Sequence, residues 1–177
     1  MPHTTKFRAW LSRLRAWMQG KRKNPEPLAE DKILSVVLLP QEASCMGGAL
    51  KIALPQSFRV LKNDSSQTTF GDNAQTLVLT VSRMPFEGSL KLVTQETLEQ
   101  AFFRQLGTIR VETFERGYVR YAPKVTVHYK NIRRTREEDA VIVLIQKKKF
   151  VYALLFTGEV KKYKPIVDTM ISTIQLA

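Results

Sequence analysis

Five segments with the composition of β-strands follow one another in the second half of the chain, at residues 109–114, 118–121, 125–132, 140–146 and 150–156. In the third segment, Val125, Val127 and Tyr129 alternate with polar residues, as in a half-exposed strand. The fourth segment is apolar at every position from Val141 to Ile145, as in a central strand covered on both faces. This run predicts an antiparallel meander.

Two helices are expected beside these strands. Thr94 is a candidate N-cap for a helix that ends at Gly107 and carries one apolar face, made of Leu98, Ala101, Phe102 and Leu106. The last helix is expected to start near Lys164, because Pro165 is tolerated only in the first turn. Its apolar side carries Val160, Tyr163, Val167, Met170, Ile171 and Ile174.

Further strands are expected at residues 33–39, 49–53 and 59–62, around Thr69, and at 76–82. The order is strands, helix, strands, helix. It predicts an α+β fold in which helices pack on an antiparallel β-sheet.

The first 27 residues differ in character from the rest. They predict an amphipathic helix, because six apolar residues recur at helical spacing: Phe7, Trp10, Leu11, Leu14, Trp17 and Met18. Cations lie beside or opposite this stripe and after Gly20: Lys6, Arg8, Arg13, Arg15, Lys21, Arg22 and Lys23. Pro25 and Pro27 indicate a short stiff linker. The predicted division is therefore a helix and linker at 1–27 and a single domain at 28–177.

The net charge of +12 is concentrated in this extension. Residues 1–25 carry seven basic residues and no acid, whereas residues 26–177 carry 21 basic and 16 acidic residues. No apolar run approaches the roughly 20 residues that span a bilayer. Arg8, Arg13 and Arg15 interrupt any secretory signal, so a cytoplasmic protein is expected. An organelle transit peptide is the alternative if the source is eukaryotic.

The chain offers few groups for catalysis or metal binding. Cys45, expected in a loop, is the single cysteine, and His3 and His128 are the two histidines. They suggest no nucleophile–base pair and are too few for a structural zinc site. Glu137, Glu138 and Asp139 are expected in a solvated loop. With no nucleotide-binding motif, the sequence predicts a non-enzymatic protein without cofactor, metal or small-molecule substrate.

Aromatic and basic residues also interleave in one region, a faint version of an RNA-binding sheet: Tyr118, Arg120, Tyr121, Lys124 and Tyr129. Their spacing fits no RNA-recognition motif. We expect the aromatics to pack across the sheet instead, which makes nucleic acid an unlikely partner.

Several short patterns carry a family resemblance. They are the strand and Pro-x-x-aromatic sequence at 49–58, the strand at 77–82 followed by Arg83, the helix at 94–106, and the closing strand and helix ending in Met170-Ile171-Ser172-Thr173-Ile174. Over residues 47–176 the chain resembles the PsbP-like superfamily, whose members include PsbP, DcrB and the Eag chaperones of type VI secretion effectors. The resemblance implies a layered α+β sandwich and no catalytic residues. The chain departs from the pattern in its basic N-terminal helix, the added strand at 33–39 and the absence of an export signal.

The amphipathic helix indicates function, because its apolar face must be covered for so short a helix to be ordered. Three surfaces could cover it: an anionic membrane, a groove on a partner protein, or the protein's own domain. The leading hypothesis is a non-catalytic module attached peripherally to the inner face of a membrane. The alternatives are a chaperone or adaptor for a protein client, as the Eag resemblance suggests, and, third, a nucleic-acid-binding protein.

Strand direction predicts a second basic feature. If the last three strands of the meander are antiparallel, residues 133–139 and the start of the final helix lie at the same end of the sheet. This basic rim comprises Arg133, Arg134, Arg136, Lys161, Lys162 and Lys164, with Glu137, Glu138, Asp139 and Glu159 as counter-charges. It is expected to be either a solvated rim or a second anionic contact.

Overall fold

The computed structural model describes Trp10, Arg13 and residues 39–177 except 107, 134 and 135, and it leaves the side chains of 101–108 and 133 undescribed. The predicted amphipathic helix and linker therefore lie outside the described residues, apart from Trp10 and Arg13. The strand expected at 33–39 lies outside them too, apart from Leu39, which belongs to no strand.

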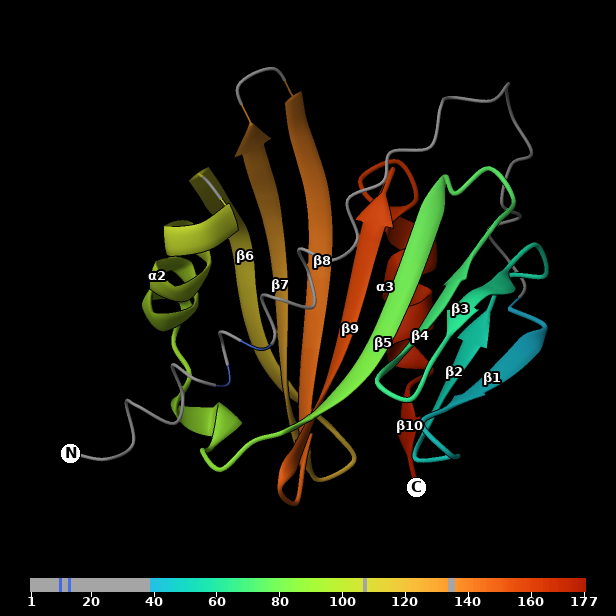
Figure 1. Ribbon diagram of the computed structural model, residues 1–177, viewed down its shortest axis with the longest axis horizontal. Coiled ribbons are helices and arrows are strands. Elements are labelled where there is room, and N and C mark those ends of the chain that lie inside the picture. The colour runs from blue at the N-terminus through green and yellow to red at the C-terminus, as the bar shows by residue number, and fades with distance from the viewer. Residues whose placement is uncertain (1–9, 11–12, 14–38, 107, 134–135) are drawn as a thin grey trace.

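The predicted meander is present and antiparallel (Figure 1). It consists of β6 (Thr108–Val119), β7 (Ala122–Arg133), β8 (Arg136–Lys147) and β9 (Phe150–Gly158). The sheet continues through β5 (Leu77–Pro85), β4 (Gln67–Gly71) and β3 (Arg59–Asn63), in the order β3-β4-β5-β9-β8-β7-β6. As predicted, the residues from Val141 to Ile145 are almost completely buried, because both faces of β8 are covered.

Two predictions within the meander are wrong. The segments expected at 109–114 and 118–121 form one strand, because pairing with β7 continues past an irregularity between Val111 and Thr113. The residues from Glu137 to Asp139 belong to β8 rather than to a loop, since the β7–β8 pairing extends to Arg133 and Arg136.

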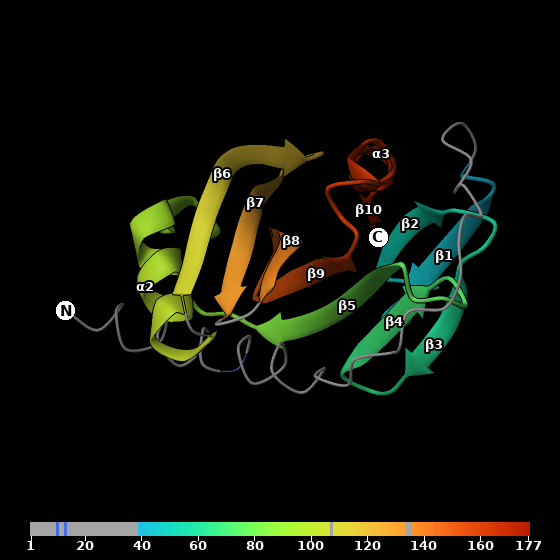
Figure 2. The same ribbon diagram turned by 90° about the horizontal axis from the view of Figure 1, so that it is seen from above.

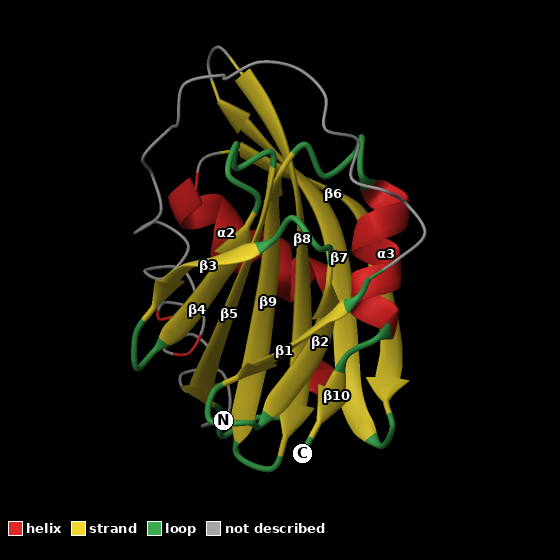
Figure 3. Ribbon diagram, turned by 90° about the vertical axis from the view of Figure 1, so that its right-hand side faces the viewer, coloured by secondary structure: helices red, strands yellow, loops and turns green. Residues whose placement is uncertain are grey.

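A second, three-stranded sheet consists of β1 (Gln41–Cys45), β2 (Leu50–Leu54) and β10 (Gln175–Leu176). β1 was not predicted from the sequence, and the loop position expected for Cys45 is wrong. Cys45 is the last residue of β1, pairs with Leu50 and is buried. Figure 3 shows this small sheet lying over one face of the large sheet.

Three helices complete the described fold: η1 (Leu90–Leu92), α2 (Gln95–Leu106) and α3 (Lys164–Ser172). The Oγ1 atom of Thr94 accepts a hydrogen bond from the backbone N–H of Thr97 at 3.2 Å, which confirms the predicted N-cap. Pro165 lies in the first turn of α3, as predicted. No helix among the described residues is long and apolar enough to cross a membrane.

The large sheet separates two hydrophobic cores (Figure 2). One face packs against α3 and the three-stranded sheet, with Leu79, Val143 and Phe156 at its centre. The other face packs against η1 and α2, through Leu90 and Leu98. The fold is therefore a layered α+β structure, as predicted.

Candidate anion-binding surface

Cys45 and His128 offer no evident catalytic chemistry. Burial raises the pKa of the Cys45 thiol to about 11, so it is protonated at neutral pH and a weak nucleophile. His128 is half-buried on β7, opposite Thr113 of β6 and Val141 of β8. In the part of the chain that the structure describes, no group of three acidic, His or Cys side chains could hold a metal ion.

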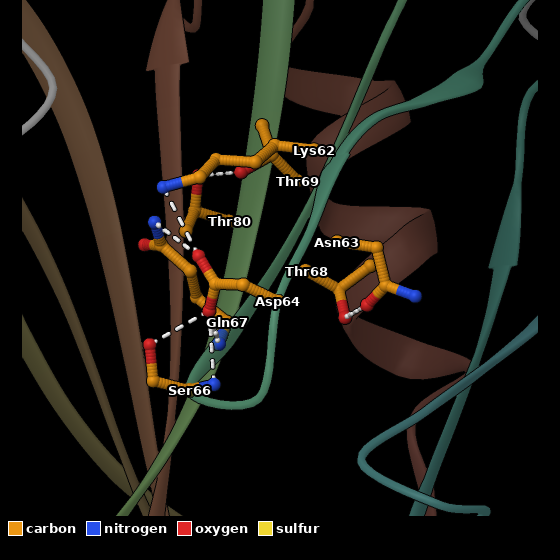
Figure 4. Close-up of polar contacts among 8 residues, drawn as sticks. All are labelled: Lys62, Asn63, Asp64, Ser66, Gln67, Thr68, Thr69 and Thr80. Carbon is orange, nitrogen blue, oxygen red and sulfur yellow. Dashed lines mark hydrogen bonds and ion pairs between the residues drawn. The ribbon is translucent and has the colours of Figure 1, made fainter.

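A dense polar cluster lies at the β3–β4 turn (Figure 4). Asp64 accepts hydrogen bonds from the backbone N–H and hydroxyl of Ser66, at 2.9 and 2.7 Å, and from the backbone N–H of Gln67 at 2.9 Å. Lys62 Nζ lies 3.0 Å from the same carboxylate. The Ser66 and Lys62 side chains hold the pKa of Asp64 well below its ordinary value. These contacts are local and close the turn, so the cluster is structural.

Of the thirteen apolar and basic residues named for the predicted N-terminal helix, the structure describes Trp10 and Arg13. Trp10 is 3% exposed, and its ring centroid lies 4.8 Å from that of Phe86. It belongs to the core that also contains Leu90 and Leu98. Trp10 therefore packs on the protein's own domain, which was one of the three surfaces considered for the helix.

The strand topology from which the basic rim was predicted is present, whereas Arg134 and the side chain of Arg133 lie outside the described residues. The end of β7, the start of β8 and the end of β9 lie at one end of the sheet, where α3 also begins (Figure 1). We call this the distal end. Several of its cations face acids: Arg136 lies 4.0 Å from Glu138, Lys162 lies 3.3 Å from Glu159, and Lys164 bonds Asp168. Binding of an anion by this rim remains a prediction.

The opposite end of the sheet carries more cations and fewer acids. This turn end is formed by residues 83–93, 116–124 and 146–150. Its cations are Arg83, Lys91, Arg116, Arg120, Lys124, Lys147, Lys148 and Lys149. Glu87 is the one acid in these three segments. None of the salt bridges found between described residues involves any of the eight cations.

Strand register brings these segments together. The β6–β7 turn consists of Arg120 and Tyr121, and the β8–β9 turn consists of Lys148 and Lys149. Because β7 and β8 are neighbours, the two turns lie side by side at one end of the sheet (Figure 1), about 10 Å apart by strand spacing. A long cation occupies a left-handed conformation in each turn, with φ 54° at Arg120 and 55° at Lys148. Gly or Asn adopts this conformation at lower cost, so these turns are not optimised for backbone stability alone.

Large apolar side chains are exposed among these cations. Tyr121 is 96% exposed, Leu92 78% and Tyr118 61%. The Lys91 ammonium lies 6.0 Å from the centre of the Tyr118 ring. The expectation that these aromatics pack across the sheet is therefore wrong for Tyr118 and Tyr121, although Tyr129 is buried. Tyr121 projects because it lies in the turn, where no neighbouring strand covers it.

The sequence predicted neither the turn at Arg120 and Tyr121 nor its position beside the β8–β9 turn. Arg120 and Tyr121 were expected at the end of a strand at 118–121, and the aromatic and basic residues of this region were related only to nucleic-acid binding. The strand-direction argument that predicted the distal rim also places the connection at 147–149 at the other end. That signal was present in the sequence.

Comparisons with known proteins address the fold. No protein-family model matches the sequence, and no curated protein matches it. Among solved structures, the chain is similar to cyanobacterial PsbP (CyanoP) from Synechocystis sp. PCC 6803, with a TM-score of 0.61, 13% identity, and coverage of 77% of this chain and 92% of that one. It is also similar to the Pseudomonas aeruginosa protein PA94, described as a putative regulator, with a TM-score of 0.51, 15% identity, and coverage of 70% and 88%.

A protein of Bacteroides thetaiotaomicron is similar over 79% of this chain but 49% of its own length, with a TM-score of 0.54 and 10% identity. At these identities the likeness concerns the fold and not the function. The chain has the PsbP-like fold.

Proposed function

We propose that the protein is a non-catalytic binding module that attaches peripherally to an anionic membrane surface. The observation that carries the proposal is the turn end, where eight cations and three exposed apolar side chains accompany a single acid. Lysine and arginine near an anionic bilayer each contribute about 1 kcal/mol before screening. Tyrosine and leucine favour the boundary between headgroups and acyl chains. This combination suits a membrane surface better than a purely electrostatic partner.

The N-terminal extension is part of the proposal through its charge. Its seven cations would add to the same attraction, because the extension contains no acid before Glu26. Burial of Trp10 leaves that side chain unavailable to lipid while it packs on Phe86. We therefore assign membrane contact to the cations of the extension and to the turn end. The inner face of a cellular membrane fits best, since anionic lipids are concentrated there.

A second candidate function is an adaptor or chaperone for a protein client. It is favoured by β3, an edge strand whose five residues are all exposed, including Val60 and Leu61. An extended client segment can pair with such an edge. The irregularity between Val60 and Lys62 and the charge of Lys62 oppose strand addition, which places this candidate second.

Sedimentation with lipid vesicles tests the proposal. The full-length protein is expected to sediment with phosphatidylcholine vesicles containing about a third phosphatidylserine, and not with phosphatidylcholine alone. Raising the salt from about 0.1 M to 1 M shortens the screening length from roughly 10 to 3 Å and should release most of the protein. Absence from the anionic pellet at 0.1 M salt contradicts the proposal. Duplex DNA that displaces the protein at equal phosphate concentration would favour a nucleic-acid partner instead.

A further inference from the structure

The segment at residues 86–93, which includes η1 and is called the 86–93 loop below, crosses the turn end. Two side chains of the sheet form hydrogen bonds with its backbone. Gln146 of β8 donates from Nε2 to the Gly88 carbonyl at 2.8 Å and accepts at Oε1 from the Leu90 N–H at 2.7 Å. Arg116 of β6 donates to the Lys91 carbonyl at 2.9 Å and to the Val93 carbonyl at 2.6 Å. The loop is therefore fixed across the width of three strands.

Its apolar side chains divide into two groups. Phe86, Leu90 and Val93 are buried in the core shared with α2, whereas Leu92 points outward and is 78% exposed. A single exposed leucine is ordinary on a protein surface. Here, however, the backbone on both sides of Leu92 is hydrogen-bonded to Arg116, so its side chain keeps its outward position.

The residues around Leu92 favour a binding partner that is both anionic and partly apolar. Lys91 precedes it, and the exposed Tyr118 ring lies beside Lys91. The cations of the two neighbouring turns lie at the same end of the sheet, with Glu87 as the one acid of the three segments. A nucleic-acid backbone would satisfy the cations but offers no apolar phase for Leu92. A bilayer interface satisfies both.

We propose that the 86–93 loop is a preformed insertion element, which places Leu92 below the headgroup layer of an anionic membrane while the cations of the turn end contact the headgroups. Gln146 is a positioning residue in this arrangement, because it fixes the loop and remains beneath it. A loop that is already ordered loses little conformational freedom on insertion, which favours binding. This inference rests on the proposed function and specifies which residue enters the membrane.

Site-specific labelling tests the insertion. In the full-length Leu92→Cys variant, a thiol-reactive NBD fluorophore will label residue 92 selectively, because Cys45 is buried and its pKa is raised to about 11. The unsubstituted protein controls for labelling of Cys45. The matched control is Val60→Cys, at an exposed apolar position on the edge strand β3.

On saturation with vesicles containing phosphatidylserine, NBD at residue 92 is expected to brighten about threefold or more and to be quenched by spin-labelled lipid. NBD at residue 60 should change little. Independently, Leu92→Asn should weaken vesicle binding by about tenfold, since partial burial of a leucine is lost, whereas Val60→Asn should leave binding unchanged.

The role of Gln146 has its own readout. Gln146→Ala removes two loop contacts without changing any charge. In the labelled Leu92→Cys background, it should reduce the NBD signal at least by half, with an unchanged slope of log affinity against log salt. If Gln146→Ala only made the protein less stable, the NBD signal and the salt dependence of binding would both decrease, whereas the proposal expects only the NBD signal to decrease.

The outcomes distinguish the inference from the proposed function. Failure of the unsubstituted protein to bind anionic vesicles overturns both. Vesicle binding without brightening at residue 92, or with equal brightening at residue 60, overturns the insertion inference alone. Equal brightening on duplex DNA and on vesicles would assign the loop to nucleic-acid contact and also overturn it.

Discussion

Reversing Arg120, Lys148 and Lys149 to glutamate is expected to lower binding to anionic vesicles by about 100-fold or more. Each reversal changes the local charge by two units, and each unit contributes about 1 kcal/mol near an anionic surface before screening. The three reversals together change the charge by six units, which is worth about 6 kcal/mol before screening. If screening removes half of this free energy, about 3 kcal/mol remains, which corresponds to a factor above 100 in affinity. Vesicle sedimentation over a range of lipid concentrations gives the ratio.

A matched control uses the distal end of the sheet. Reversal of Arg136, Lys161 and Lys162 to glutamate changes the net charge by the same amount at the other end of β8, about 40 Å away by strand rise. Because Arg136 and Lys162 already face acids, we expect a loss of less than about fivefold. If the distal variant lost more affinity for anionic vesicles than the turn-end variant, the predicted basic rim would be the binding surface instead of the turn end.

Trp10→Ala is expected to reduce the free energy of unfolding by about 3 kcal/mol. Removing a buried aromatic side chain takes away its transfer free energy and leaves a cavity, and such substitutions typically cost about 3–5 kcal/mol. Here the indole is 3% exposed and packs on Phe86. Urea denaturation followed by circular dichroism measures the change, and Trp10→Phe should recover part of it.

The same variant distinguishes two roles for this tryptophan. If Trp10 instead inserts into lipid, Trp10→Ala will leave the urea midpoint unchanged and weaken vesicle binding at low salt. That combination would contradict the packing of Trp10 on the domain and favour the membrane surface for the whole apolar face of the extension.

Much of the fold follows from local patterns, because the alternation in β7, the apolar run in β8 and the cap at Thr94 each specify an element without reference to the rest of the chain. β1 could not be found this way. Its residues, Gln41 to Cys45, include no β-branched or aromatic side chain, and the strand exists because β2 pairs with it along its whole length. Tertiary pairing here overrides weak strand propensity.

Only part of the candidate site could be predicted from the sequence. The direction of the strands in the meander places the connection before residue 125 and the connection at 147–149 at one end, so Lys124 and the three lysines could have been grouped. The turn at Arg120 and Tyr121 could not, because both residues were expected in a strand. The hydrogen bonds of Gln146 and Arg116 to the 86–93 loop could not, because they join residues up to 58 positions apart and depend on side-chain geometry. The packing of Trp10 on Phe86 could not be predicted either, because no local sequence pattern indicates a contact between residues so far apart in the chain.

Hydrogen–deuterium exchange on vesicles tests the central claim most directly, because it locates the contact on the unsubstituted full-length protein. When the protein is bound to anionic vesicles, backbone amides at 88–93, 117–124 and 146–150 are expected to gain protection relative to the free protein. Amides at 136–139 and 159–164 should exchange at unchanged rates. Protection at the distal end with none at the turn end would contradict the account.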